Sequence, residues 1–180
     1  MTLSKIETFK ENELTLNKTE DDDQFLTFKL SNEMFAIGIL NIKEILEYGN
    51  LTTVPMMPAF VRGVINLRGA VVPVIDLIAR FSSNRSEVTK RTCIVIIEVT
   101  TDDDCHVIGV MVDAVSAVLE IPANEIEPPP ALGAKIRTDF IHGMGKVDGD
   151  FVIILNVDNV LSVDELGMLN QNTESPALER

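Results

Sequence analysis

The 180-residue chain has 46% hydrophobic and 24% charged residues, which is typical of a packed globular protein. Its length predicts one domain or two small lobes in close contact. The net charge of −13 disfavours polyanionic partners, so we expect no binding to nucleic acid. No apolar run approaches the roughly 20 residues of a membrane span, and the N-terminus lacks an apolar leader, so the sequence indicates a cytosolic protein without membrane insertion.

The first part of the chain predicts a polar tail, a hairpin and a short helix. Residues 1 to 23 end in an acidic run from Glu20 to Asp23 and are expected to form a flexible acidic tail. The segments FLTFKL and MFAIGI follow, separated by turn-forming residues, and predict two strands. From Asn41 to Glu47 the isoleucines recur at helical offsets behind an asparagine, which predicts a short helix.

The rest of the chain predicts further short strands. The segments LTTV, GVINL and AVVPVIDL are punctuated by proline and glycine, and RTCIVIIEV, CHVIGVMV and VSAVLEI are expected to form a meander. The prolines from Pro128 to Pro130 mark a surface connection. A final hairpin is predicted from GMGKV and FVIILNV, with Asp148 and Gly149 as its turn. A short helical pattern, DNVLSVDEL, and a polar tail close the chain.

The number and spacing of these strands predict a mainly β fold. Many short strands without strand–helix alternation favour β-barrels over a parallel sheet. The strands are too numerous for one small barrel, so two small barrels that share a core are the economical solution. A single larger barrel or a sandwich stays open at this stage.

The side chains available for chemistry do not predict a catalytic, metal or cofactor site. His106 and Cys105 are neighbours on one predicted strand and must point to opposite faces, which disfavours a nucleophile–base pair. His142 lies in a strand–turn context, and no metal-ligand spacing joins the histidines to the cysteines. The sequence leaves a disulfide between Cys93 and Cys105 open, although buried thiols are the simpler interpretation.

One loop residue is a candidate contact for another protein. Arg68 precedes Gly69 between two apolar strands, so a tight turn would hold its guanidinium at a loop tip. Arginine is enriched in the binding hot spots of protein interfaces. The alternatives are a solvated arginine or one that folds back on Asp76.

The surrounding motifs sharpen this interpretation. The sequence contains FAIGILNIKEI, PAFVRG and NLRGAVVPVIDL between Phe35 and Leu77, and GVMVDAV from Gly109 to Val115. In this order the motifs resemble the coupling protein family of bacterial chemotaxis, CheW, over about residues 24 to 162. The N-terminal tail and residues 163–180, a short helix and polar tail, lie outside the resemblance.

The resemblance implies a fold and a role. It implies two small SH3-like five-stranded β-barrels packed on a shared core, with short helices. Proteins of this family are non-catalytic adaptors: they bind the cytoplasmic tips of chemoreceptors and the regulatory domain of the histidine kinase CheA in signalling arrays. A cytoplasmic location at membrane receptor arrays, reached through protein contacts, follows. Carried over by position, the receptor-binding residues would be Ile39, Ile42, Glu44, Gly63, Arg68 and Cys93, and the kinase-binding residues Glu127 and Leu132.

Each of these assignments has a structural alternative. Ile39 and Ile42 could accept an apolar ridge of a receptor hairpin or could pack in the core. Glu44 could be solvated or could hold Arg68 in place, and Gly63 could be a bend. Two other functions also stay open: a small-ligand-binding β-barrel, and an enzyme that uses a cysteine as nucleophile.

Overall fold

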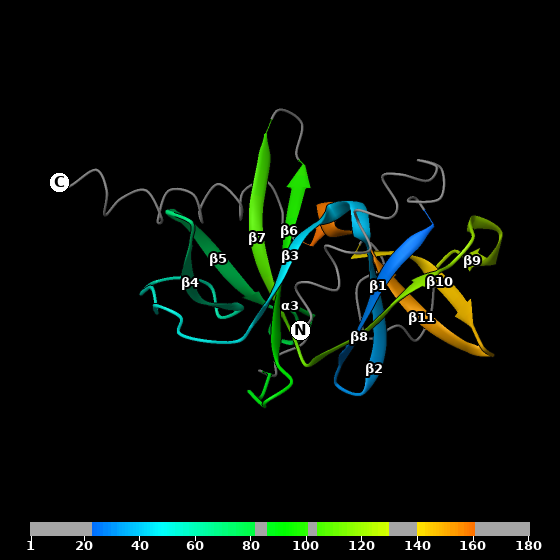
Figure 1. Cartoon of the computed structure of the whole chain (residues 1–180), viewed down its shortest axis with the longest axis horizontal. Helices are drawn as coiled ribbons and strands as arrows, with labels where there is room; N and C mark the ends of the chain where they lie inside the picture. Colours follow the sequence, from blue (N-terminus) through cyan, green and yellow to red (C-terminus); the bar gives the residue numbers. More distant parts are fainter. Residues whose placement is uncertain (1–22, 82–85, 101–103, 130–139, 161–180) are drawn as a thin grey trace.

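The computed structural model describes residues 23–81, 86–100, 104–129 and 140–160. These residues form two β-sheets joined by short helical segments, which confirms the predicted mainly β fold (Figure 1). The predicted N-terminal tail, the tip of the aspartate-rich turn, Leu132 and the C-terminal helix lie outside the described residues. Among the described residues, no helix combines the length and apolar character needed to cross a membrane.

The five-stranded sheet, at the left of Figure 1, has the order β3-β6-β7-β5-β4. Its strands are β3 (Ile42–Glu47), β4 (Val61–Leu67), β5 (Ala70–Asp76), β6 (Cys93–Thr100) and β7 (Cys105–Val112). The segment after β3 reaches the opposite edge of the sheet, where Thr52 pairs with Val64 of β4. Two reciprocal backbone hydrogen bonds of 2.9 Å join these residues. The sheet therefore curls until its two outer strands approach each other.

The six-stranded sheet, at the right of Figure 1, has the order β8-β1-β2-β11-β10-β9. It contains β1 (Gln24–Leu30), β2 (Glu33–Gly38), β8 (Ala114–Glu120), β9 (Ile126–Glu127), β10 (Ile141–Val147) and β11 (Asp150–Leu155). The helical segments are η1 (Ile39–Asn41), α3 (Leu77–Phe81), η2 (Ala123–Glu125) and η4 (Val157–Asn159).

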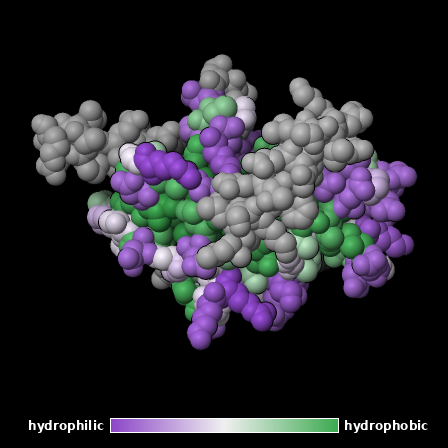
Figure 2. Space-filling model, in the orientation of Figure 1, coloured by the Kyte–Doolittle hydropathy of each residue, from purple (hydrophilic) through white to green (hydrophobic). Residues whose placement is uncertain are grey.

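The core has three parts, because successive side chains of a strand point to opposite faces. On β6, Val95 and Ile97 face a large cluster that both sheets share, whereas Ile94 and Ile96 face a smaller cluster enclosed by the five-stranded sheet. A third cluster, which includes Phe25, is enclosed by the six-stranded sheet. In Figure 2, which has the orientation of Figure 1, hydrophobic surface shows over both the left and the right part of the molecule, and hydrophilic residues surround much of it. The shared cluster joins the two sheets.

The two sheets repeat one arrangement. The β10–β11 hairpin copies the β4–β5 hairpin at a constant sequence spacing, with a bulge between Ile141 and Gly143 where the first has one between Val61 and Gly63. The backbone N–H of Asp76 donates to the Phe60 carbonyl at 2.7 Å, and that of Asn156 donates to the Phe140 carbonyl at 2.8 Å. Both hairpins pair in parallel with a strand of another hairpin, β7 or β2. The molecule therefore consists of two lobes of the same design.

Three sequence predictions about elements are wrong. The expected helix from Asn41 to Glu47 is η1 followed by strand β3. A bulge between Ile42 and Glu44 places Ile42 and Ile45 on the same face of β3, so a strand shows a spacing of three that resembles a helix. The segment LTTV contributes only the Thr52 bridge.

The third wrong prediction is the meander that was to include VSAVLEI. This segment is β8, and it pairs with β1 of the other sheet and not with β7. The chain changes sheets at Asp113, whose backbone N–H donates to the Lys29 carbonyl at 3.0 Å and whose carboxylate accepts from the Ser31 N–H at 2.9 Å. Asp113 thus fixes the passage from one lobe to the other.

Candidate functional site

A two-residue turn carries Arg68 at the tip of the β4–β5 hairpin. Arg68 and Gly69 have φ angles of 52° and 89°, the positive values that a tight hairpin turn of this kind requires. The Asn66 side chain accepts a hydrogen bond of 2.9 Å from the Gly69 N–H. The prediction of a tight turn is therefore confirmed.

Glu44 of β3 holds the Arg68 side chain. The guanidinium makes two hydrogen bonds to the carboxylate, from Nη1 to Oε1 and from Nη2 to Oε2, the second at 3.2 Å. The exposed fraction is 7% for the Glu44 side chain and 71% for that of Arg68. Because a buried carboxylate requires a partner and a planar guanidinium can bond both its oxygens, the pair fixes the geometry of an exposed cation. Asp76, the alternative partner, binds other groups.

This ion pair closes the five-stranded sheet. Glu44 belongs to β3 at one edge, and Arg68 follows β4 at the other. A cavity of about 850 Å³ lies beside the pair. Its lining includes the exposed side chains of Leu40 and Val71, together with Lys43 and His106. A cation flanked by apolar side chains on an open surface can bind a protein segment with a carboxylate and an apolar face.

The two isoleucines predicted near the receptor groove are core residues. Ile39 and Ile42 are each 1% exposed and belong to the cluster shared by both sheets. The core-packing alternative therefore describes their side chains, which no partner can reach without rearrangement. Their exposed neighbours are Leu40 and Lys43.

Gly63 occupies a bend, as the structural alternative for it proposed. It follows the bulge in β4 and has a φ of 154°, and a Cβ there would lie 2.6 Å from the carbonyl oxygen of Thr52. Only glycine lets the chain after β3 approach β4 so closely. Gly63 thus shapes the sheet edge and lies at the opposite end of β4 from Arg68.

Cys93 lies on the other face of the sheet from the ion pair. It begins β6 and joins the shared cluster, whereas Glu44 pairs with Ile96, whose side chain faces the opposite cluster. Its thiol donates to the Arg91 carbonyl at 3.3 Å. Burial, followed by the negative charge of Glu47, raises the pKa of the Cys93 thiol, while a backbone hydrogen bond at Val115 opposes the shift. Both cysteines are free, so the disulfide alternative is wrong.

The remaining predicted residues are spread further. Glu127, a predicted kinase contact, is exposed on β9 of the six-stranded sheet, and Leu132 lies outside the described residues. His106 and Cys105 lie at the start of β7, and His142 is exposed on β10. Within the described ranges, no three His, Cys, Asp or Glu side chains are placed to hold a metal ion.

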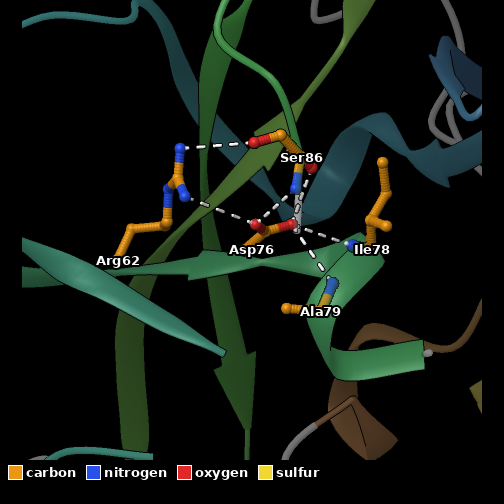
Figure 3. Close-up of polar contacts among 5 residues, drawn as sticks. All are labelled: Arg62, Asp76, Ile78, Ala79 and Ser86. Carbon is orange, nitrogen blue, oxygen red and sulfur yellow. Dashed lines mark hydrogen bonds and ion pairs between the residues drawn. The ribbon is translucent and has the colours of Figure 1, made fainter. Parts of the chain in front are cut away.

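Sequence reasoning missed a buried polar cluster at Asp76, which is 0% exposed (Figure 3). Oδ1 accepts from the N–H groups of Ile78 and Ala79 at 3.1 and 3.2 Å and from the Ser86 hydroxyl at 2.7 Å. Oδ2 accepts from the Ser86 N–H at 2.9 Å and lies 4.0 Å from Arg62 Nη1. Asp76 therefore caps α3 and anchors the chain at Ser86. An aspartate directly before LIARF was the available signal.

Comparisons with known proteins identify relatives over most of the chain. Residues 24–165 match the family model described as the CheW-like domain. The chain is 32% identical over 152 residues to the chemotaxis protein CheW of Klebsiella aerogenes, covering 84% of this chain and 89% of that protein. It is 31% identical over 147 residues to the CheW of Rhizobium meliloti, with coverages of 82% and 92%. Protein FrzA of Myxococcus xanthus is 30% identical over 142 residues, with coverages of 78% and 86%.

A solved structure also matches. The crystal structure of the scaffolding protein TtCheW from Thermoanaerobacter tengcongensis superposes with a TM-score of 0.72 at 33% identity. The match covers 80% of this chain and 90% of that protein. These comparisons do not support the small-ligand-binding alternative.

Proposed function

Because this chain belongs to the CheW-like family and is a chemotaxis coupling adaptor, we propose that it binds the cytoplasmic tips of chemoreceptors and the regulatory domain of the histidine kinase CheA at the same time. Residues 24–162 would form the adaptor domain, and residues 1–23 and 163–180 would lie outside it. The adaptor would act in the cytoplasm at receptor arrays, by binding and without catalysis.

The observation that carries the proposal is the ion pair of Arg68 with Glu44. The exposed guanidinium is held on a turn by a buried carboxylate, so its position is set before a partner arrives. Such preorganisation reduces the entropy lost on binding. Leu40 and Val71 beside it offer apolar surface to a receptor hairpin. Ile39 and Ile42 would support the shape of this surface by packing in the core beneath it. Gly63 would contribute by shaping the edge of the same sheet.

The kinase contact is proposed on the other lobe. Glu127 is exposed on β9 of the six-stranded sheet, whereas the Arg68 turn belongs to the five-stranded sheet, so each partner would have a sheet of its own. Leu132, which lies outside the described residues, is proposed as a second kinase contact on the resemblance alone. The adaptor role needs no reactive group, and the raised pKa of the Cys93 thiol agrees with this, because the unreactive protonated form then prevails near neutral pH.

Charge reversal at Arg68 tests the receptor contact. We expect Arg68→Glu to remove pull-down by a soluble receptor tip and to abolish receptor-dependent kinase activity in a reconstituted mixture, while binding to the kinase regulatory domain persists. Since the new carboxylate would lie beside buried Glu44, Arg68→Lys serves as a second variant that keeps the charge but loses the two-point hydrogen bonding. Thermal unfolding of both variants checks the fold. Undiminished receptor binding by folded Arg68→Glu would contradict the proposal.

A further inference from the structure

The short helix α3 carries a cation to the place where the two lobes meet (Figure 1). The guanidinium carbon of Arg80 lies 5.2 Å from the centroid of the Phe60 ring and 4.8 Å from that of the Phe140 ring. Both distances fall within the roughly 6 Å at which the face of an aromatic ring attracts a cation. Phe60 directly precedes β4 of the five-stranded sheet, whereas Phe140 directly precedes β10 of the six-stranded sheet. Arg80 therefore contacts both lobes at once.

A hydrogen bond crosses the same junction. The Arg80 Nε donates to the carbonyl of Val160 at 2.9 Å. Val160 follows η4 and is 1% exposed, so its carbonyl must find a donor within the protein. The neighbouring Phe81 packs its ring against those of Phe35 on β2 and Phe140. Polar and aromatic contacts thus attach α3, which follows β5 of one lobe, to the other lobe.

The two ends of this hydrogen bond are equivalent positions of the repeated lobe design. Val160 lies 80 residues after Arg80, which is also the spacing between the two repeated hairpins. Phe60 and Phe140 are separated by the same spacing, and their carbonyls accept equivalent backbone hydrogen bonds. The lobes therefore meet here through equivalent positions, and the arginine on one side supplies a donor that the valine side chain on the other lacks.

Directional contacts give this junction a role that apolar packing alone does not have. The shared cluster resists separation of the lobes, but the hydrophobic effect has no preferred direction. A hydrogen bond and a cation over aromatic faces both lose strength when their geometry changes. A planar guanidinium can stack and donate at the same time, which distinguishes it from the ammonium of a lysine. Rotation of one lobe against the other would therefore weaken the contacts of Arg80.

We propose that Arg80 is an interlobe clamp, which fixes the angle between the two lobes and thereby couples the partners bound to them. The inference rests on the proposed function, which assigns the receptor to the five-stranded sheet and the kinase to the six-stranded sheet. Energetic coupling between distant sites is carried by packed side chains, hydrogen bonds and rigid elements. A receptor that moves one lobe can act on the kinase only if the other lobe moves with it. Arg80 is thus a positioning residue, whose loss weakens the coupling and not the binding of either partner alone.

Distance measurements between spin labels on the two lobes test the clamp in the full chain. One label is attached to the exposed native Cys105 of β7 and the other to Lys146→Cys of β10, in a chain that also carries Cys93→Val to remove the buried thiol. We expect a narrow distance distribution in this chain. Arg80→Met keeps the length of the side chain but removes the guanidinium, so it should broaden or shift the distribution.

Arg62→Met is the matched control, because it removes another half-buried guanidinium. Arg62 Nη1 lies 4.0 Å from Asp76, and Nη2 donates to the Ser86 carbonyl at 3.4 Å, so these contacts stay within the five-stranded lobe. This control should lower stability and leave the distance distribution unchanged. Arg80→Lys keeps a cation near the rings without the planar group, and we expect an intermediate effect. It carries the comparison if Arg80→Met does not fold.

The effect on coupling is measured in a reconstituted mixture of the chain, a soluble receptor tip and the kinase. We expect Arg80→Met to reduce the receptor-dependent kinase activity about three- to tenfold, while the affinity for each partner alone changes less than about twofold. Calorimetric titration with each partner separately measures these affinities. Loss of affinity for a single partner, in proportion to the loss of kinase activity, would contradict a positioning role.

The outcomes separate the clamp from the proposed function. If both Arg80 variants keep the narrow distribution, or if Arg62→Met broadens it equally, the clamp is overturned. If the distribution broadens but the mixture keeps its full kinase activity, the role of Arg80 in coupling is wrong. If the wild-type chain binds neither partner, the proposed function fails, and the distance measurement still decides whether Arg80 fixes the lobes.

Discussion

At the scale of single residues, the same side-chain type has opposite roles on the two faces of one sheet. Glu44 is buried and both its carboxylate oxygens accept hydrogen bonds from Arg68, whereas Glu47, three residues later, is exposed. Residues 44 to 47 pair with β6 in unbroken register, so ordinary strand alternation places Glu44 and Glu47 on opposite faces of the sheet. From the sequence alone, Glu44 as the partner of Arg68 is one of two alternatives, because β3 and the Arg68 turn belong to opposite edges of the sheet and meet only in the fold.

The Cys93 thiol gives a pH-dependent prediction at this scale. Burial and Glu47 raise its pKa above the ordinary value near 9.0, so between these two pKa values the folded chain keeps a proton that the unfolded chain has lost. We therefore expect a stabilising contribution that is complete below about pH 9 and is lost as the pH rises through the folded pKa. Cys93→Val should show a smaller alkaline loss of the free energy of unfolding than the wild type.

Urea unfolding between neutral and alkaline pH measures this difference. Cys105→Val is the control for removal of a thiol, because Cys105 is exposed on β7. A wild type and a Cys93→Val variant with parallel pH profiles would rule out the contribution of Cys93.

At the scale of elements, hairpins are predictable where their turns depend on local residues. Asp148 and Gly149 adopt φ angles of 51° and 86°, nearly those of Arg68 and Gly69, and both turns are visible in the sequence. Pairings between distant strands are not visible there. The placement of β8 beside β1 depends on Asp113 bonding to backbone groups at Lys29 and Ser31, which is a tertiary contact. For the same reason the Asp76 cluster was missed, since Ser86 and Arg62 meet it only in the fold.

The junction between β5 and α3 depends on the carboxylate of Asp76, so its removal should lower the stability of the fold. Asp76→Asn would turn an amide N–H₂ group toward the hydrogen-bond donors that surround Asp76 and would leave Arg62 without its carboxylate. We expect it to lower the free energy of unfolding by about 2–4 kcal/mol. The amide of Ser86 should also exchange its hydrogen faster.

The repeated hairpin supplies the matched control. Asn156 holds the position equivalent to Asp76 and keeps the same backbone hydrogen bond, to Phe140. Asn156→Asp should cost roughly 1 kcal/mol or less, because the side chain is half-buried and can reach water. Equal losses of unfolding free energy from Asp76→Asn and Asn156→Asp would show that the Asp76 cluster contributes no more to stability than the equivalent position in the other lobe.

At the scale of the whole molecule, the shared cluster predicts that the two lobes unfold together. It contains side chains from both sheets, so loss of packing there exposes apolar surface on each. Ile97→Ala removes a fully buried side chain from this cluster and should cost about 2–5 kcal/mol. We expect faster hydrogen exchange in β1 and β2 as well as in β6 and β7.

Ile96→Ala is a close control, because Ile96 is the adjacent residue of the same strand and is equally buried. Its side chain faces the cluster enclosed by the five-stranded sheet. Hydrogen exchange measured by mass spectrometry should then show an effect concentrated in that sheet. If both variants accelerate exchange in the same strands to the same degree, the shared cluster is not what couples the lobes.

The repeated hairpin also carries a different charge at its tip in each of the two lobes. The tips of the two hairpins have nearly the same backbone geometry, but one carries Arg68 and the other Asp148. A partner that recognised only backbone shape would dock in two orientations, related by an exchange of lobes. A partner that carries a charge distinguishes the two tips, because reversing its orientation would turn attraction into repulsion. The opposite charges at the two equivalent turns would therefore favour one orientation of a charged partner over the other.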